Sequence, residues 1–266
     1  MSETRSRHSG VRASLSFGLS LLLAAACSPE APAATPTPTP IVLLTSGEAY
    51  ASAMRLRQGL MDGAGSSGEV EVRLIASNEV ESALADGQAD LALVMGDPDP
   101  GLWAAPIAQL PIRVVVNAAN PLAEVGEDDL RGLFAGEMTD WRSVGGASAA
   151  VRIVAQDAEL ELTAVFVRDM LRGGRIGGSA RIAPAGWAAA EAVGEDLGAI
   201  GYLLCADMTS RLHEIRIFDS DSGAPLEPSL SLFAIAPGAP SGATLSFLLW
   251  AQSAAAQPSV MGECGE

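Results

Sequence analysis

The sequence predicts an α/β protein whose sheets are mostly parallel. From Ile41 onward, short apolar runs of strand length alternate with longer runs whose apolar residues recur at helical spacing. Several of the helical runs end at glycine, the residue that most often terminates a helix. Strands that alternate with helices are typical of parallel sheets covered by helices, because each crossover helix returns the chain in the same direction.

The expected strands and helices follow one another along the whole folded part. We expect strands at 41–46, 69–77, 90–96, 111–120, 152–156, 180–185, 199–204, 214–219 and 231–237. We expect helices at 48–63, 78–87, 127–136, 159–174, 187–196 and 242–256. The second of these helices begins with Asn78, a good N-cap residue, and stops at Gly87.

The first 27 residues predict export from the cytoplasm. Three arginines precede an apolar stretch at 15–26 that is too short to span a membrane as a helix, which is typical of a signal peptide. The stretch ends in Ala-Ala-Ala-Cys, which resembles the lipobox of bacterial lipoproteins, where the cysteine becomes the lipidated first residue. The resemblance implies that lipid on Cys27 holds the protein to a membrane, outside the cytoplasm. A cleaved signal without lipid and an uncleaved anchor are the alternatives.

Residues 28–40 predict a tether between this signal and the folded part. Proline and threonine alternate there, and such a segment forms an extended chain rather than a core. The 226 residues from 41 to 266 are enough for one large domain or for two smaller lobes.

The negative charge of the chain disfavours polyanionic partners. The sequence holds 16 Lys+Arg against 32 Asp+Glu, and all 16 cations are arginine. Without residues 1–27 the balance is 13 against 31, a net charge of −18. Nucleic acids and anionic lipid headgroups both need clustered cations, so neither is expected to bind.

Three cysteines leave the redox state open. If Cys27 is lipidated, Cys205 and Cys264 remain as an even pair in an oxidising compartment, where a disulfide can form. Two unpaired, buried thiols are the alternative.

The sequence offers little support for an enzyme. His213 is the one histidine beyond the signal, in a segment expected to lie just before a strand, and no G-x-S-x-G motif accompanies it. Metal-binding clusters of His and Cys and the glycine-rich dinucleotide fingerprint are also missing from the sequence. We therefore expect no catalytic residues, no metal and no cofactor.

Residues 111–146 resemble part of a known family. A β-branched strand, an Asn-Pro pair, a short acidic helix with an aromatic residue near its end, a Thr-Asp-Trp turn and a Gly-Gly pair follow in order: Asn120-Pro121, Leu130, Phe134, Gly136, Thr139-Asp140-Trp141 and Gly145-Gly146. This order is similar to that in the phosphate-binding proteins of ABC transporters. Residues 197–204, LGAIGYLL, also resemble a strand of that family, and the resemblance extends over nearly everything from Ile41 onward.

The resemblance implies the type II periplasmic binding protein fold. That fold has two α/β lobes, each a mostly parallel sheet flanked by helices, and two hinge crossings between them. One lobe is expected from 41–112 and 206–266, and the other from 113–205. The solute lies in the cleft between the lobes, which close around it. The implied partners are a small solute such as phosphate and an ABC permease, and a monomer is expected.

The family binds its anion with polar groups that follow successive strands. Thr45 and Ser46 match the loop after the first strand, Ser77 and Asn78 match the loop after the second, and Asp97 follows the third. The resemblance therefore implies that these five residues contact the solute.

The fourth family contact departs from the pattern. The family has an arginine at a strand end and then Ser-Gly-Thr at a helix start. Here Gln156 stands at the arginine position, and Leu160-Glu161-Leu162 stand at Ser-Gly-Thr. Glu161 brings a negative charge to a helix N-terminus, which normally favours anions. Acidic residues in a first helical turn also stabilise helices generally, so this charge alone does not identify a ligand. A one-residue gap would instead place Thr163 at the threonine position.

Two functions follow. The first is a solute-binding lipoprotein that delivers phosphate or another small oxyanion to an ABC importer. The second is a divergent member whose rebuilt site, including Gln156 and Glu161, binds a cation or a neutral polar molecule, or which serves as a sensor or scaffold.

Overall fold

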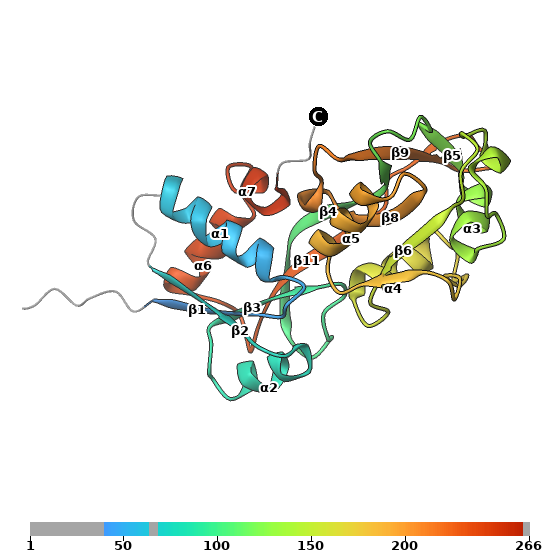
Figure 1. Ribbon diagram of the computed structural model, residues 1–266. Coiled ribbons are helices and arrows are strands. Elements are labelled where there is room, and N and C mark those ends of the chain that lie inside the picture. The colour runs from blue at the N-terminus through green and yellow to red at the C-terminus, as the bar shows by residue number, and fades with distance from the viewer. Residues whose placement is uncertain (1–39, 64–68, 263–266) are drawn as a thin grey trace, which may run out of the picture. The chain divides into compact units, whose positions relative to one another are not determined.

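The computed structural model describes residues 40–63 and 69–262, and Figure 1 shows how their helices and strands are arranged. The strands are β1 (Ile41–Thr45), β2 (Val70–Leu74), β3 (Leu91–Met95), β4 (Trp103–Asn117), β5 (Glu124–Gly126), β6 (Arg152–Gln156), β7 (Arg181–Ala183), β8 (Ala199–Leu204), β9 (Leu212–Phe218), β10 (Pro225–Leu226) and β11 (Ser229–Ala236). The helices are α1 (Tyr50–Gly63), α2 (Val80–Ala85), α3 (Glu127–Ala135), α4 (Glu161–Asp169), α5 (Gly186–Glu195), α6 (Gly242–Ala251) and α7 (Gln257–Met261). The α/β class is thus confirmed.

The strands run in the order β2-β1-β3-β11-β4-β8-β6-β7, and β9 pairs with β4, β5 and β10. The pairs β1–β2, β1–β3, β6–β7 and β6–β8 are parallel, as helical crossovers between them require. The strands β11 and β4 that join these groups are antiparallel to their neighbours. Both parallel groups therefore connect through β4.

Helices cover both faces of the sheet around β1 and β3. Apolar residues of α1, α6 and α7 pack in one cluster with Leu43, Leu91 and Leu93 (Figure 1). On the other face, Val80 and Leu84 of α2 pack with Leu44, Ala92 and Ile235. Burial on both faces explains why these strands are apolar along their length.

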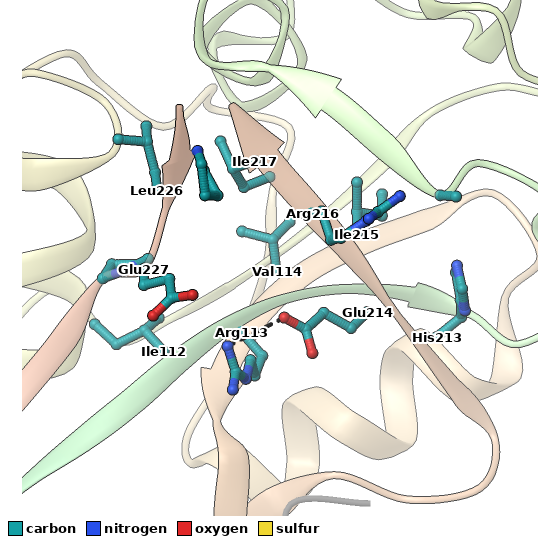
Figure 2. Close-up of a pocket in the computed structure, with 13 residues that line it drawn as sticks. Ile112, Arg113, Val114, His213, Glu214, Ile215, Arg216, Ile217, Leu226 and Glu227 are labelled. Carbon is teal, nitrogen blue, oxygen red and sulfur yellow. Dashed lines mark ion pairs between the residues drawn. The ribbon is translucent and has the colours of Figure 1, made fainter. Parts of the chain in front are cut away.

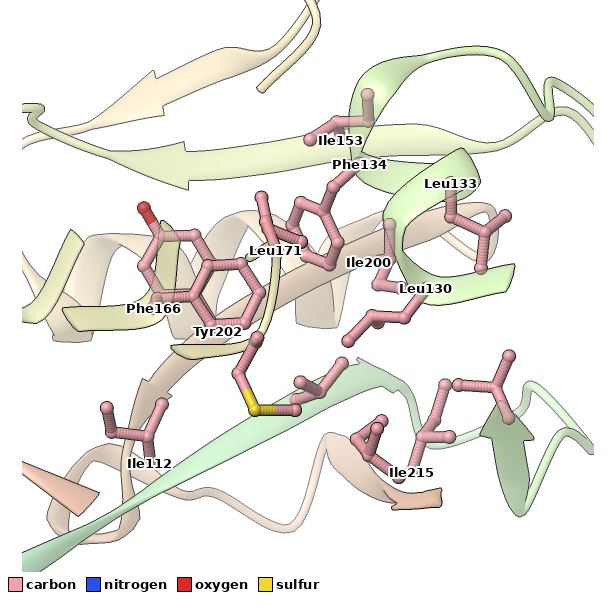
Figure 3. Packing of buried hydrophobic residues seen from close by; sticks show 14 of the residues in the cluster. Ile112, Leu130, Leu133, Phe134, Ile153, Phe166, Leu171, Ile200, Tyr202 and Ile215 are labelled. Atoms are coloured by element: carbon pink, nitrogen blue, oxygen red, sulfur yellow. The ribbon is translucent and has the colours of Figure 1, made fainter. Parts of the chain in front are cut away.

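The sheet around β6 and β8 is also covered on both faces. Alanines of α5 and Val193 pack against Val115 and Leu203. On the opposite face, α3 and α4 bury a cluster of large side chains (Figure 3). At its centre the rings of Phe166 and Tyr202 stack with centroids 4.0 Å apart, and Phe134 meets Phe166 edge-on at 4.9 Å.

Strand β4 differs most from its expected bounds, because it begins eight residues earlier than the predicted start at 111. The run contains Pro106 and Pro111, and proline usually interrupts a strand. Pro106 lies where the register with β11 shifts between Leu232 and Phe233. A proline lacks the N–H that a strand ladder uses, and such an irregularity tolerates it.

Two predicted helices end too late. The run 159–174 is helical only from Glu161 to Asp169, since Arg172 and Gly173 adopt positive φ angles of 49° and 74° that no α-helix continues. The run 242–256 stops at Ala251, and Pro258 in the first turn of α7 starts a separate helix. His213 was expected before a strand but lies within β9, and the short β5 and β10 were not predicted.

Strand β9 packs with residues of 113–205. Ile215 and Ile217 lie in the same cluster as Val114 and Tyr202, although their segment was expected in the first lobe. The second passage between the two packing clusters lies within β11, because Leu230 packs in the same cluster as Tyr202 whereas Leu232 packs with Leu43.

Cys205 is buried and disulfide-bonded. Cys27 and Cys264, the other two cysteines, lie outside the described residues, as do the predicted signal and all of the tether except Pro40. Pairing of Cys205 with Cys264 therefore stays a prediction. Among the helices of the described ranges, none is both long and apolar enough to cross a membrane.

Candidate functional site

A cavity of about 250 Å³ lies at the ends of β1, β2 and β3, beside the start of α4. Its polar lining comprises two serines, Ser46 and Ser77, and six carboxylates, Glu48, Glu81, Asp97, Asp99, Glu159 and Glu161. None of the lining residues is a Lys, Arg or His. The carboxyl ends of parallel strands are where α/β proteins commonly bind small molecules.

The loop after β1 places its two hydroxyl groups differently. Thr45 is fully buried, and its Oγ1 donates to the carbonyl oxygen of Ser46 at 3.1 Å. Ser46 is 7% exposed and lines the cavity, and its hydroxyl has no hydrogen-bond partner among the described residues. The Ser46 hydroxyl is therefore the one of the two that a solute could reach.

The N-terminus of α4 is capped by a carboxylate that is far away along the chain. The residue before the helix, Leu160, offers no capping side chain. Instead, Glu48 from the β1–α1 loop accepts hydrogen bonds from the backbone N–H of Leu162 at 2.9 Å and of Glu161 at 3.2 Å. These N–H groups belong to the positions that match the family's Ser-Gly-Thr. A carboxylate of this chain thus takes hydrogen bonds that a bound anion would take.

Glu48 has an unfavourable environment for its charge. Burial raises the pKa of Glu48, and the charge of Glu161 raises it further, while the two backbone hydrogen bonds lower it. The net pKa lies above the ordinary value for glutamate, because loss of water outweighs the hydrogen bonds. Keeping the Glu48 carboxylate charged at this position therefore costs free energy.

Glu161 touches the loop after β3. A Cβ added to Gly96 would lie 2.5 Å from Cγ and Cδ of Glu161, so the glutamate side chain would have to shift to make room for it. Gly96 also has a φ of 78°, which favours glycine. Glu48 and Glu161 therefore both connect α4 to the strand ends of the first parallel group.

Replacing Gly96 by alanine is expected to lower the free energy of unfolding by about 1–3 kcal/mol, through backbone strain and the clash with Glu161. Chemical denaturation measures this change. Gly47→Ala is the matched control, because its Cβ would meet nothing within 4 Å and its φ is not in the left-handed region. Equal stability of the two variants would contradict the packing described for Glu161.

The side chain of Gln156 is buried and forms hydrogen bonds inside the protein. It is 3% exposed, and its side-chain amide donates to the carbonyl oxygen of Tyr202 at 2.9 Å. The Tyr202 hydroxyl accepts from the backbone N–H of Gln156 and lies 2.8 Å from Oγ1 of Thr163. Burial raises the pKa of Tyr202, so its hydroxyl stays protonated. The polar groups of Gln156 and Thr163 are thus used within the fold.

The seven residues expected to bind the solute are only partly brought together. Ser46, Ser77, Asp97 and Glu161 line the cavity, whereas Thr45, Asn78 and Gln156 do not. Solute contact by any of the seven stays a prediction. The sequence reading missed Glu48, because it stands one residue beyond the matched Thr45-Ser46-Gly47 loop and its partners lie more than 110 residues away.

The carboxylates of the cavity are not arranged as a metal site. Within residues 40–63 and 69–262, no group of three or more His, Cys, Asp or Glu side chains is close enough to hold a metal ion.

A second cavity, of about 430 Å³, lies over β4, β9 and β10 (Figure 2). Its wall includes His213, Arg113 and Glu214, and the last two form an ion pair at 3.2 Å. It adjoins antiparallel strands and no helix N-terminus, so its groups do not converge on a ligand as those of the first cavity do. We take the first cavity as the candidate site, although the second is larger.

The cavity lies at the ends of parallel strands and faces a helix N-terminus. The two groups of parallel strands are joined by antiparallel strands. Together these features define a solute-binding protein of the periplasmic binding type. Sequence comparison gives the same class. The chain belongs to the family described as the PBP superfamily domain, which matches residues 33–235. As the sequence predicts, it is a binding protein rather than an enzyme.

Solved structures share the fold at low sequence identity. A protein from Clostridium perfringens, described as a phosphate ABC transporter substrate-binding protein with bound phosphate, has a TM-score of 0.66 and 16% identity, over 82% of this chain and 96% of its own. An ABC-type phosphate transport receptor from Vibrio cholerae has a TM-score of 0.58 and 18% identity, over 82% and 96%. An OxyR C206 mutant from Corynebacterium glutamicum has a TM-score of 0.59 and 16% identity, over 84% and 66%. No curated protein matches the sequence.

Proposed function

We propose that this protein is an extracytoplasmic solute-binding lipoprotein of the ABC-importer type whose solute is not free phosphate. The family and the fold support solute binding. The signal-like segment ending at Cys27 supports export and lipid anchoring. The solute would bind in the 250 Å³ cavity, between one lobe centred on β1 and β3 and another centred on β6 and β8.

One observation carries the exclusion of phosphate: Glu48 already accepts the hydrogen bonds of the α4 N-terminus. An incoming phosphate would have to displace this carboxylate, and it would then face Glu161 and the other acidic side chains of the cavity. The negative charges of phosphate and of these side chains repel each other, and no cationic residue lines the cavity to offset the repulsion.

A sensor or scaffold is the second candidate. A side chain of the chain itself, Glu48, joins the β1–α1 loop to the N-terminus of α4, which is a bridge that a bound solute would otherwise make. Neighbouring genes distinguish the two candidates, because a permease and an ATPase beside this gene favour transport.

Isothermal titration calorimetry of the full chain with inorganic phosphate at neutral pH tests the exclusion. We expect no heat of binding up to millimolar phosphate, from protein shown by circular dichroism to be folded. A dissociation constant in the micromolar range would refute it, since phosphate would then have displaced Glu48.

A further inference from the structure

We propose that the cavity binds a short aliphatic amine, with its ammonium groups held by carboxylates and by Ser46. This inference rests on the proposed function, because it names the chemical class of the solute for the same cavity. It depends on the charges of the wall, on the unpartnered hydroxyl of Ser46 and on the elements that carry the acidic side chains.

The carboxylates of the wall are largely without cationic partners. Glu81, Asp97, Glu159 and Glu161 form no ion pair in the part of the chain that the structure describes. Arg168 interacts electrostatically with Asp97 and Glu161, but it is exposed, pairs with Asp169 and does not line the cavity. The cavity therefore attracts a cation and repels an anion.

Ser46 supplies an independent polar contact. The residue is 7% exposed and lines the cavity, and its hydroxyl makes no hydrogen bond to a described residue. The Ser46 oxygen is therefore available to accept a hydrogen bond from a donor that enters the cavity. An ammonium group has three such donors and no acceptor.

The spacing of the acids favours an organic cation over a metal ion. No three of the described acidic, His or Cys side chains converge closely enough to coordinate a metal. Glu81 and Asp97 come from α2 and the loop after β3, whereas Glu159 and Glu161 come from the start of α4. Because the acids lie on different elements, a flexible molecule with two ammonium groups can contact more than one of them.

The rest of the lining suits the carbon chain of such a molecule. The cavity is also lined by the apolar residues Val80, Val94, Met95, Pro98 and Ile235. Methylene groups are stabilised when they are buried against such surface. A volume of about 250 Å³ is below the usual range for drug-sized ligands, which limits the solute to a short chain.

Calorimetric titration of the full chain with 1,4-diaminobutane at neutral pH and low salt tests the proposal. We expect saturable binding that weakens with added salt, and no binding of 1,4-butanediol, which has the same length without charge. Glu161→Gln should weaken the affinity by about tenfold or more, because it removes one charge-assisted contact. Ser46→Ala should weaken it by about threefold to tenfold.

Asp86→Asn is the matched control, since it removes one exposed carboxylate that does not line the cavity. Its affinity for the diamine should equal that of the unmodified protein. Equal weakening by Asp86→Asn and Glu161→Gln would overturn the site, because the diamine would then be a counterion of the acidic surface. Failure of the diamine to bind, with binding of a neutral solute that Ser46→Ala weakens, would overturn the amine and leave the proposed solute-binding function standing. If no solute in such a panel binds, both proposals fail.

Discussion

Replacing Glu48 by alanine is expected to make the thermal stability of the protein depend on sulfate and phosphate. The variant leaves the N–H groups of Glu161 and Leu162 without their acceptor, and loss of a helix cap costs about 0.5–2 kcal/mol. An oxyanion that binds these groups restores part of the loss by mass action. Thermal denaturation followed by circular dichroism, at constant ionic strength and rising sulfate, measures both effects.

Glu81→Ala is the control for this experiment, because it removes an acid from the same cavity that caps no helix. Sulfate stabilises most proteins to some degree, so the informative quantity is the difference in slope between the two variants. A steeper slope for Glu48→Ala is expected. Parallel slopes would show that the α4 N-terminus is no anion site even when it is vacated, and the explanation given for phosphate exclusion would fail.

Replacing Phe166 by alanine is expected to lower the free energy of unfolding by about 3–5 kcal/mol. The ring is fully buried, stacks on Tyr202 and meets Phe134 edge-on (Figure 3), so alanine leaves a cavity that these rings cannot fill. Urea denaturation measures the change.

Phe166→Leu is the matched variant, because it keeps most of the volume and loses only the aromatic contacts. It is expected to cost about 1–1.5 kcal/mol. If the two variants were equally stable, α4 would not depend on this packing, and the position of its N-terminus beside the cavity would need another cause.

The sequence by itself predicted the α/β class and most of the strands and helices. Apolar periodicity and glycine stops are local signals, and they placed β1, β6, β8 and α3 to within one residue. The signals failed where a tertiary partner changed the outcome. Strand β4 extends across two prolines because β11 pairs with it along that stretch, and α4 ends early where Arg172 adopts a positive φ.

The sequence also predicts a site that differs from the anion site of the family, since Gln156 and Leu160-Glu161-Leu162 depart from its pattern. Only the tertiary structure decided which groups contact these positions. Glu48 meets the α4 N-terminus across 113 and 114 residues of chain, and Tyr202 engages Gln156 from 46 residues away. No local pattern encodes such contacts, because a side chain's partner is selected by how the strands and helices pack and not by its neighbours along the chain.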